Sequence, residues 1–237
     1  MEKLFRVAAY IPPVASHIRG ESEKTIKQFT DKYSKLRKGK VLLAMPENGL
    51  SHTAIIDQVS GLTQSCRKSY TDGGHLSGAV FSADDDHWNF IAETMRLSIV
   101  SNPLFIDEFI YVSRMEAEII RWTLNLYNGD KDACGVVTSG GTESILLAVL
   151  AYREKAKHER GITKPNIVMS ETAHAAFDKA CFYFGVEMRK LPITSDFKAD
   201  FNGIKRSIDK NTIALVVSCP EYAFGTYDDV EKIAALA

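Results

Sequence analysis

Residues 133–144 read Ala-Cys-Gly-Val-Val-Thr-Ser-Gly-Gly-Thr-Glu-Ser and join two segments of different hydrophobic rhythm. The apolar run 133–138 predicts a short strand, and residues 142–158, apolar almost all round at their centre, predict a helix. The two glycines between them let the backbone bend and approach a ligand closely. A helix that begins there offers unpaired N–H groups and partial positive charge, which suit a phosphate. The alternative interpretation is an ordinary tight turn with a threonine N-cap.

The alternation of strand and helix continues beyond this turn. The pattern predicts strands at 166–170, 186–191 and 212–218, and helices at 175–184, 200–207 and 228–237. Apolar strands that alternate with helices indicate an α/β fold with a mainly parallel sheet and helices on both faces. Upstream, residues 107–127 form the best amphipathic pattern, and a shorter helix is predicted near 51–60. We therefore expect an N-terminal helical and loop segment, 1–80, and a domain that occupies 81–237.

Composition limits the classes of function. The chain has 237 residues, of which 45% are hydrophobic and 25% charged, and a net charge of −1, so nothing global indicates a nucleic-acid partner. No run approaches the roughly 18 apolar residues that a membrane span needs. The four cysteines lack metal-ligand spacing, which fits a reducing, cytoplasmic location. We interpret the triplet Asp84-Asp85-Asp86 as a helix cap rather than a metal site.

His174 is the second candidate for chemistry. It follows the predicted strand 166–170, at the carboxyl edge where open α/β sheets bind ligands. Its imidazole can stack on a planar cofactor or move protons, whereas the alternative is an ion pair with Asp178 four residues on. A phosphate-binding turn after one strand and an imidazole after the next together fit pyridoxal phosphate, with its phosphate anchored and its ring stacked.

These two segments, 138–145 and 173–180, closely resemble the sphingosine-1-phosphate lyases of the pyridoxal-phosphate-dependent group II decarboxylase family. Further similar segments occur in the same order at 77–80, 101–104, 114–118, 125–129 and 182–185. The form Gly-Gly-Thr-Glu-Ser-Ile favours the lyases, because amino-acid decarboxylases of the group more often place Ala-Asn after the acidic residue.

The resemblance implies a type I pyridoxal-phosphate-dependent transferase-like fold, of which 81–237 is the first part of the large cofactor-binding domain. It implies a homodimer that cleaves a phosphorylated long-chain (sphingoid) base to a fatty aldehyde and ethanolamine phosphate. By motif match, Gly141 and Thr142 hold the cofactor phosphate, and His174 stacks on the pyridine ring. Ser218 ends a strand beneath the cofactor, and Asn102 faces the substrate or cofactor from the partner subunit.

Three positions depart from the family pattern. Phe81 stands where the family usually has a tyrosine, and Phe105 and Phe224 stand where it has histidines. The family also needs a Schiff-base lysine, normally after a histidine, and this sequence contains no His-Lys pair. We therefore expect no catalytic residue in this chain and no catalysis by the chain alone.

The final segment is strong helix sequence without a cap, so we expect the domain to be incomplete at its C-terminus. Three interpretations stay open. The chain is part of a lyase, a non-catalytic relative that acts by binding, or part of an amino-acid decarboxylase of the same group. A longer eukaryotic parent could be anchored at the endoplasmic reticulum.

Overall fold

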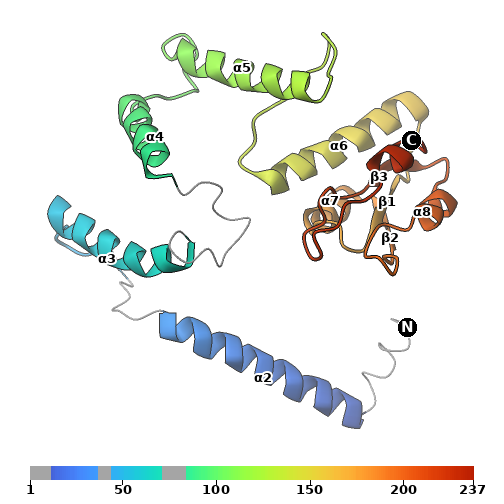
Figure 1. The fold of residues 1–237 in the computed structure, drawn as a ribbon, viewed down its shortest axis with the longest axis horizontal. Helices are drawn as coiled ribbons and strands as arrows, with labels where there is room; N and C mark the ends of the chain where they lie inside the picture. The colour runs from blue at the N-terminus through green and yellow to red at the C-terminus, as the bar shows by residue number, and fades with distance from the viewer. Residues whose placement is uncertain (1–11, 37–43, 71–83) are drawn as a thin grey trace. The chain divides into compact units, whose positions relative to one another are not determined.

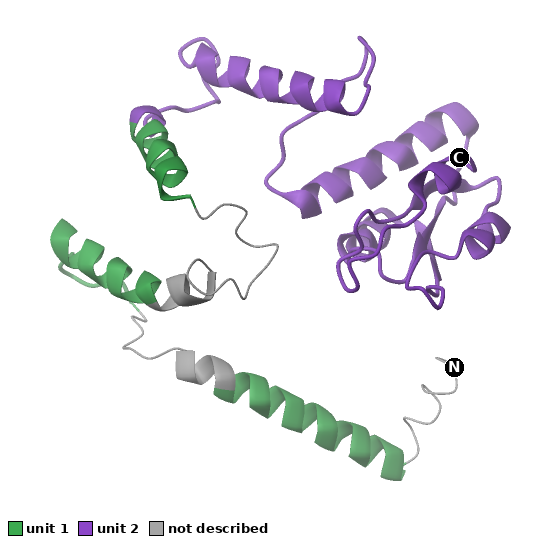
Figure 2. Ribbon diagram, viewed as in Figure 1, with its two compact units in different colours: residues 1–96 green, residues 97–237 purple. Residues whose placement is uncertain are grey.

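A computed structural model describes residues 12–36, 44–70 and 84–237 of the chain. Contacts divide the chain into two compact units, 1–96 and 97–237, which Figure 2 shows in different colours. The boundary expected near residue 80 lies outside the described residues and stays a prediction.

The first unit contributes helices, as the sequence predicts. They are α2 (Pro12–Leu36), α3 (His52–Tyr70) and most of α4 (Asp85–Ser98), and α3 is longer than the 51–60 segment expected. The carboxylate of Asp84 accepts the N–H of Asp86 at 3.0 Å and that of His87 at 3.4 Å. These bonds satisfy donors that have no partner inside α4, which confirms the helix-cap interpretation of the acidic triplet.

The second unit carries the sheet (Figure 1). Its elements are α5 (Ile110–Leu126), α6 (Gly141–Arg160), β1 (Asn166–Ser170), α7 (Ala176–Phe184), β2 (Glu187–Leu191), α8 (Phe201–Ser207), β3 (Thr212–Val216) and α9 (Val230–Ala234). The three strands are parallel in the order β2-β1-β3. The α/β class with a parallel sheet is thereby confirmed.

Two hydrophobic clusters cover the two faces of the sheet. Ile167 and Met169 of β1 pack with α6 and α7, whereas Val168, between them in sequence, packs with Ile204 of α8 and Ile233 of α9. All five residues of β1 are buried. This is the expected result for a central parallel strand, because successive side chains point to opposite faces and both faces are covered.

The strand predicted at 133–138 is wrong. These residues form an irregular connection from α5 to α6, and Val136 and Val137 are 68% and 56% exposed. A strand exists through hydrogen bonds to a neighbouring strand, and the sheet found in the described part of the chain consists of β1, β2 and β3 only. Residues 133–138 therefore have the apolar pattern of a strand, but their backbone pairs with no strand of this sheet.

Among the described residues, no helix is both long enough and apolar enough to cross a membrane.

Candidate functional site

The direction of α6 determines which end of the helix lies toward the carboxyl edge of the sheet. At the C-terminal end of α6, the guanidinium of Arg160 donates to the carbonyl of Thr212, the first residue of β3, at 3.2 Å. The helix therefore ends at the amino edge of the sheet. Its 20 residues are about 30 Å long, roughly twice the length of a five-residue strand. Because α6 packs along β3, its N-terminus lies beyond the carboxyl edge, where His174 and Ser218 follow β1 and β3.

The turn before α6 is held by its own side chains. The hydroxyl of Thr138 lies 2.7 Å from that of Ser144 and 3.1 Å from the carbonyl of Gly140. The carboxylate of Glu143 accepts the N–H of Ser139 at 2.6 Å. The side chain of Ser139, and then its N–H, stabilise the ionised carboxylate and hold the pKa of Glu143 below its usual value. The turn is thus fixed on two sides by hydrogen bonds among its own residues.

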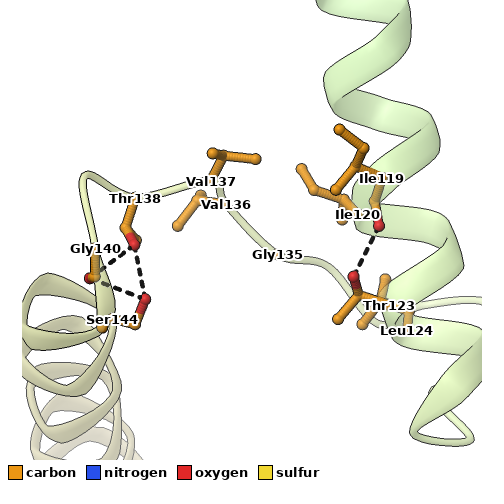
Figure 3. Close-up of a pocket in the computed structure, with 11 residues that line it drawn as sticks. Ile119, Ile120, Thr123, Leu124, Gly135, Val136, Val137, Thr138, Gly140 and Ser144 are labelled. Carbon is orange, nitrogen blue, oxygen red and sulfur yellow. Dashed lines mark hydrogen bonds between the residues drawn. The ribbon is translucent and has the colours of Figure 1, made fainter. Parts of the chain in front are cut away.

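A cavity of about 420 Å³ opens beside this turn. Figure 3 shows its two walls, one from α5 and one from the connection 135–141 with the first turn of α6. The α5 wall is apolar at Ile119 and Ile120, and the opposite wall carries the hydroxyls of Thr138 and Ser144. Its volume falls in the range of small-molecule sites, and it combines apolar surface with a few polar groups.

Gly141 and Thr142 occupy the first turn of α6 and are exposed. The N-cap residue is Gly140, and no side chain caps the helix there. A Cβ placed on Gly141 would meet no atom within 4 Å. The start of α6 therefore faces open space, and its N–H groups are available to an anion.

His174 lies in the turn between β1 and α7, with an exposed side chain. Its Nδ1 accepts the N–H of Ala176 at 3.0 Å, which orients the ring at the start of α7. The alternative pairing with Asp178 is wrong, because that carboxylate pairs with the ammonium of Lys190 at 2.7 Å. An oriented, exposed imidazole at this edge is suited to stacking against a planar ligand.

Ser218 follows β3 and is half-buried. The buried carboxylate of Asp228 accepts the N–H of Ser218 at 2.7 Å and that of Ala199 at 2.8 Å. In return, the N–H of Asp228 donates to the carbonyl of Ser218 at 3.1 Å. Asp228 therefore joins the loops that follow β2 and β3 and fixes the backbone of Ser218.

Asn102 and Phe105 do not belong to this edge. They lie in the exposed connection between α4 and α5, where the Asn102 side chain accepts the N–H of Leu104 at 3.1 Å. Phe224 lies in the loop after β3, half-exposed, with its ring stacked on Phe197 at 4.4 Å between centroids. Phe81 lies outside the described residues.

Sequence reasoning missed Glu143 and Asp228. An acidic residue in the first turn of a predicted helix was a usable signal for the first, because such residues often reach back to the N–H groups of the preceding turn. Asp228 gave no signal of this kind, because its partners lie 10 and 29 residues away.

These residues fit the cofactor that the sequence implies. The open, uncapped start of α6 suits a phosphate, and the oriented imidazole of His174 suits a planar ring. A parallel sheet with both groups at its carboxyl edge is the arrangement of a cofactor-binding α/β protein.

The chain belongs to the family whose model is described as the pyridoxal-dependent decarboxylase conserved domain, which matches residues 78–237. Membership implies pyridoxal phosphate as cofactor, as the two segments predict.

Within this family the chain is similar to sphingosine-1-phosphate lyases. The lyase of Drosophila melanogaster is 38% identical over 239 positions, which cover 99% of this chain and 43% of the lyase. The Saccharomyces cerevisiae lyase is 37% identical over 81% of this chain and 33% of its own length. The chain therefore spans less than half the length of these curated relatives.

Solved structures agree. The sphingosine-1-phosphate lyase of Burkholderia pseudomallei superposes with a TM-score of 0.77 at 34% identity, over 84% of this chain and 47% of that one. A glutamate decarboxylase of Lactobacillus brevis superposes with a TM-score of 0.62 at 20% identity, over 86% of this chain and 47% of that one, which supports the fold alone. The type I fold expected from the resemblance is confirmed.

Proposed function

We propose that this chain supplies the cofactor-anchoring part of a pyridoxal-phosphate-dependent carbon–carbon lyase. The substrate of the complete protein is a phosphorylated long-chain base, and the products are a fatty aldehyde and ethanolamine phosphate. The observation that carries the proposal is the uncapped first turn of α6, with the Gly-Gly-Thr-Glu-Ser sequence, in a chain 38% identical to a sphingosine-1-phosphate lyase.

Each residue of the site has a separate task in this proposal. The N–H groups of Gly141 and Thr142 bind the cofactor phosphate, because the start of a helix attracts an anion. The His174 ring, oriented through Nδ1, covers one face of the pyridine ring. Ser218, fixed by Asp228, forms part of the floor. Bound pyridoxal phosphate supplies the electron sink that cleavage of a carbon–carbon bond requires.

The complete protein acts as a homodimer in this proposal, with Asn102 facing the substrate or cofactor from the partner subunit. The exposed position of Asn102, in a connection away from the carboxyl edge, supports this part of the proposal.

The 237-residue chain by itself does not catalyse the cleavage in this proposal. Its sequence contains no His-Lys pair, and a lysine in that context bonds the cofactor in the family. Such a lysine needs a desolvated setting that lowers its pKa.

The experiment compares the 237-residue chain with the complete product of its gene. Each is incubated with pyridoxal phosphate and a phosphorylated sphingoid base, and fatty aldehyde is measured. We expect aldehyde from the complete product and none from the chain. Aldehyde from the chain alone refutes its inactivity, and aldehyde from neither refutes the lyase function.

A non-catalytic relative that acts by binding is the second candidate. It is favoured by Phe224, whose ring stacks on Phe197 and has no proton to exchange where the family often has a histidine. Phe81 and Phe105 favour it for the same reason. Binding of pyridoxal phosphate without cleavage by either preparation is the outcome that selects this candidate.

A further inference from the structure

Glu143 makes an interaction to which neither the motif nor the family comparison assigns a role. Its exposed carboxylate reaches back over the first turn of α6 and accepts the N–H of Ser139 at 2.6 Å. The side chain forms no salt bridge within the described part of the chain. Its hydrogen-bonding capacity is therefore directed at Ser139 of the turn, through both the N–H and the side chain of that residue, rather than at a lysine or arginine.

This bond decides which backbone donors face a ligand. The N–H of Ser139 is occupied by Glu143, and the N–H of Ser144 already donates to the carbonyl of Gly140 at 3.1 Å. The donors left at the open end of α6 include those of Gly141 and Thr142, because the first N–H groups of a helix have no partner inside it.

A second set of bonds holds the other side of the same turn. Thr138 and Ser144 are joined through their hydroxyls, and both approach the carbonyl of Gly140 (Figure 3). A turn held in this way keeps its shape before a ligand arrives. Less conformational freedom is then lost when the ligand binds.

We propose that Glu143 is a positioning residue for the cofactor phosphate. It holds the Ser139 peptide so that the first N–H groups of α6 converge on the anion, and it does not itself contact the phosphate. The inference rests on the proposed function, because it concerns the same cofactor site. A carboxylate in direct contact with the phosphate would repel it, so a role through Ser139 is the one that the hydrogen bond supports.

The test uses the 237-residue chain, with pyridoxal phosphate and phosphate-free pyridoxal as probes. The variants are Glu143→Ala, which removes the acceptor, and Glu143→Gln, which keeps an oxygen that accepts the Ser139 N–H. The matched control is Glu154→Ala, an exposed glutamate of the same helix that pairs with Arg153. Dissociation constants and melting temperatures are measured for each.

We expect Glu143→Ala to weaken pyridoxal phosphate binding about five- to tenfold, since the Thr138–Ser144 side of the turn stays intact. Pyridoxal binding, which involves no phosphate, stays unchanged. The dissociation constants of Glu143→Gln and Glu154→Ala for pyridoxal phosphate stay within about twofold of the wild-type value. Rescue by glutamine separates positioning of the turn from a general effect on the helix.

Several results would overturn the proposal. The first is an unchanged affinity of Glu143→Ala for pyridoxal phosphate. The second is tighter binding by this variant, which would make the carboxylate a competitor of the phosphate. The third is a Glu143→Gln variant that binds pyridoxal phosphate as weakly as Glu143→Ala does. If Glu143→Ala lowers the melting temperature strongly, the glutamine variant decides, because it must keep both stability and affinity. A wild-type chain that binds pyridoxal phosphate no better than pyridoxal refutes the proposed function, and this inference with it.

Discussion

Replacing Gly141 by alanine separates the structural role of the turn from its role in binding. The residue is in the first turn of α6, and an added Cβ would meet no atom within 4 Å. Its φ is not among the positive values found in the described residues, so alanine adopts the same backbone without strain. Alanine is the better helix former by about 0.5–1 kcal/mol. We therefore expect the melting temperature to rise by about 1–4 °C.

Binding should change in the opposite direction. If the phosphate lies against the backbone of Gly141, a methyl group in that space displaces it from the helix N–H groups. Loss of one hydrogen bond to a charged group costs about 1.5–3 kcal/mol, which corresponds to a roughly 10- to 150-fold larger dissociation constant. The assay is a titration with pyridoxal phosphate, beside a thermal melt.

The matched control is Gly20→Ala. Gly20 is an exposed glycine of α2 whose added Cβ would also meet nothing within 4 Å. It should gain helix stability and bind the cofactor as wild type does. If Gly141→Ala binds as tightly as wild type, the phosphate does not lie against this backbone, and the ordinary-turn interpretation holds.

Three further predictions concern the sheet and its two edges. Asn166 is fully buried, and its side chain is hydrogen-bonded to those of Asp209 and Thr212 at 2.9 and 2.8 Å. Asn166→Ala should therefore lower the free energy of unfolding by about 2–4 kcal/mol in urea titrations. A loss under about 0.5 kcal/mol would contradict this. His174→Ala should weaken binding about five- to tenfold in a titration with pyridoxal phosphate, because a ring contact is lost. An unchanged dissociation constant would exclude stacking. Bonds from Asn166 first, then from the Asn211 N–H and Arg189, lower the pKa of Asp209 from 3.8 to about 2. A carboxyl group whose pKa is lower in the folded state stabilises the fold at pH values above its unfolded pKa, and this stabilisation is lost as the pH falls through the folded pKa. The denaturation midpoint should therefore decline between about pH 4 and 2, and Asp209→Asn should reduce that decline.

The sheet could be predicted from the sequence because its signals are local. The segment 166–170 has an apolar centre at 167–169 and is bounded by turn residues, and β1 has the predicted limits. The limits of α7, β2 and α8 differ from the predicted ones by a single residue at one end. The absence of a strand at 133–138 could not be predicted in this way. The segment has the apolar pattern of a strand, but no neighbouring strand in the described sheet pairs with its backbone. Hydrophobic pattern reports what a segment can bury, whereas pairing depends on backbone from elsewhere in the chain.

The candidate site shows the same division between local and distant information. Gly141, Thr142 and His174 could be found because they lie within short motifs at the ends of predicted elements. The bond by which Asp228 fixes Ser218 could not be found in this way, because it depends on the course of a ten-residue loop. The residues that we propose as ligand contacts thus carry a local signal, whereas the residue that fixes the backbone of one of them does not.

The two walls of the cavity differ in how they are built, and this determines which part of a ligand each can recognise. The wall at the start of α6 is held by hydrogen bonds that connect Thr138, Ser139 and Gly140 to Glu143 and Ser144. The α5 wall is mainly apolar, with Ile119 half-exposed toward the cavity, and its Thr123 hydroxyl already donates to the carbonyl of Ile119 at 2.8 Å. Directional donors select a charged group of fixed geometry, whereas apolar surface accepts many shapes. If the proposed function is correct, the wall at the start of α6 anchors the phosphate through directional bonds, whereas the α5 wall contributes apolar contact without fixed geometry.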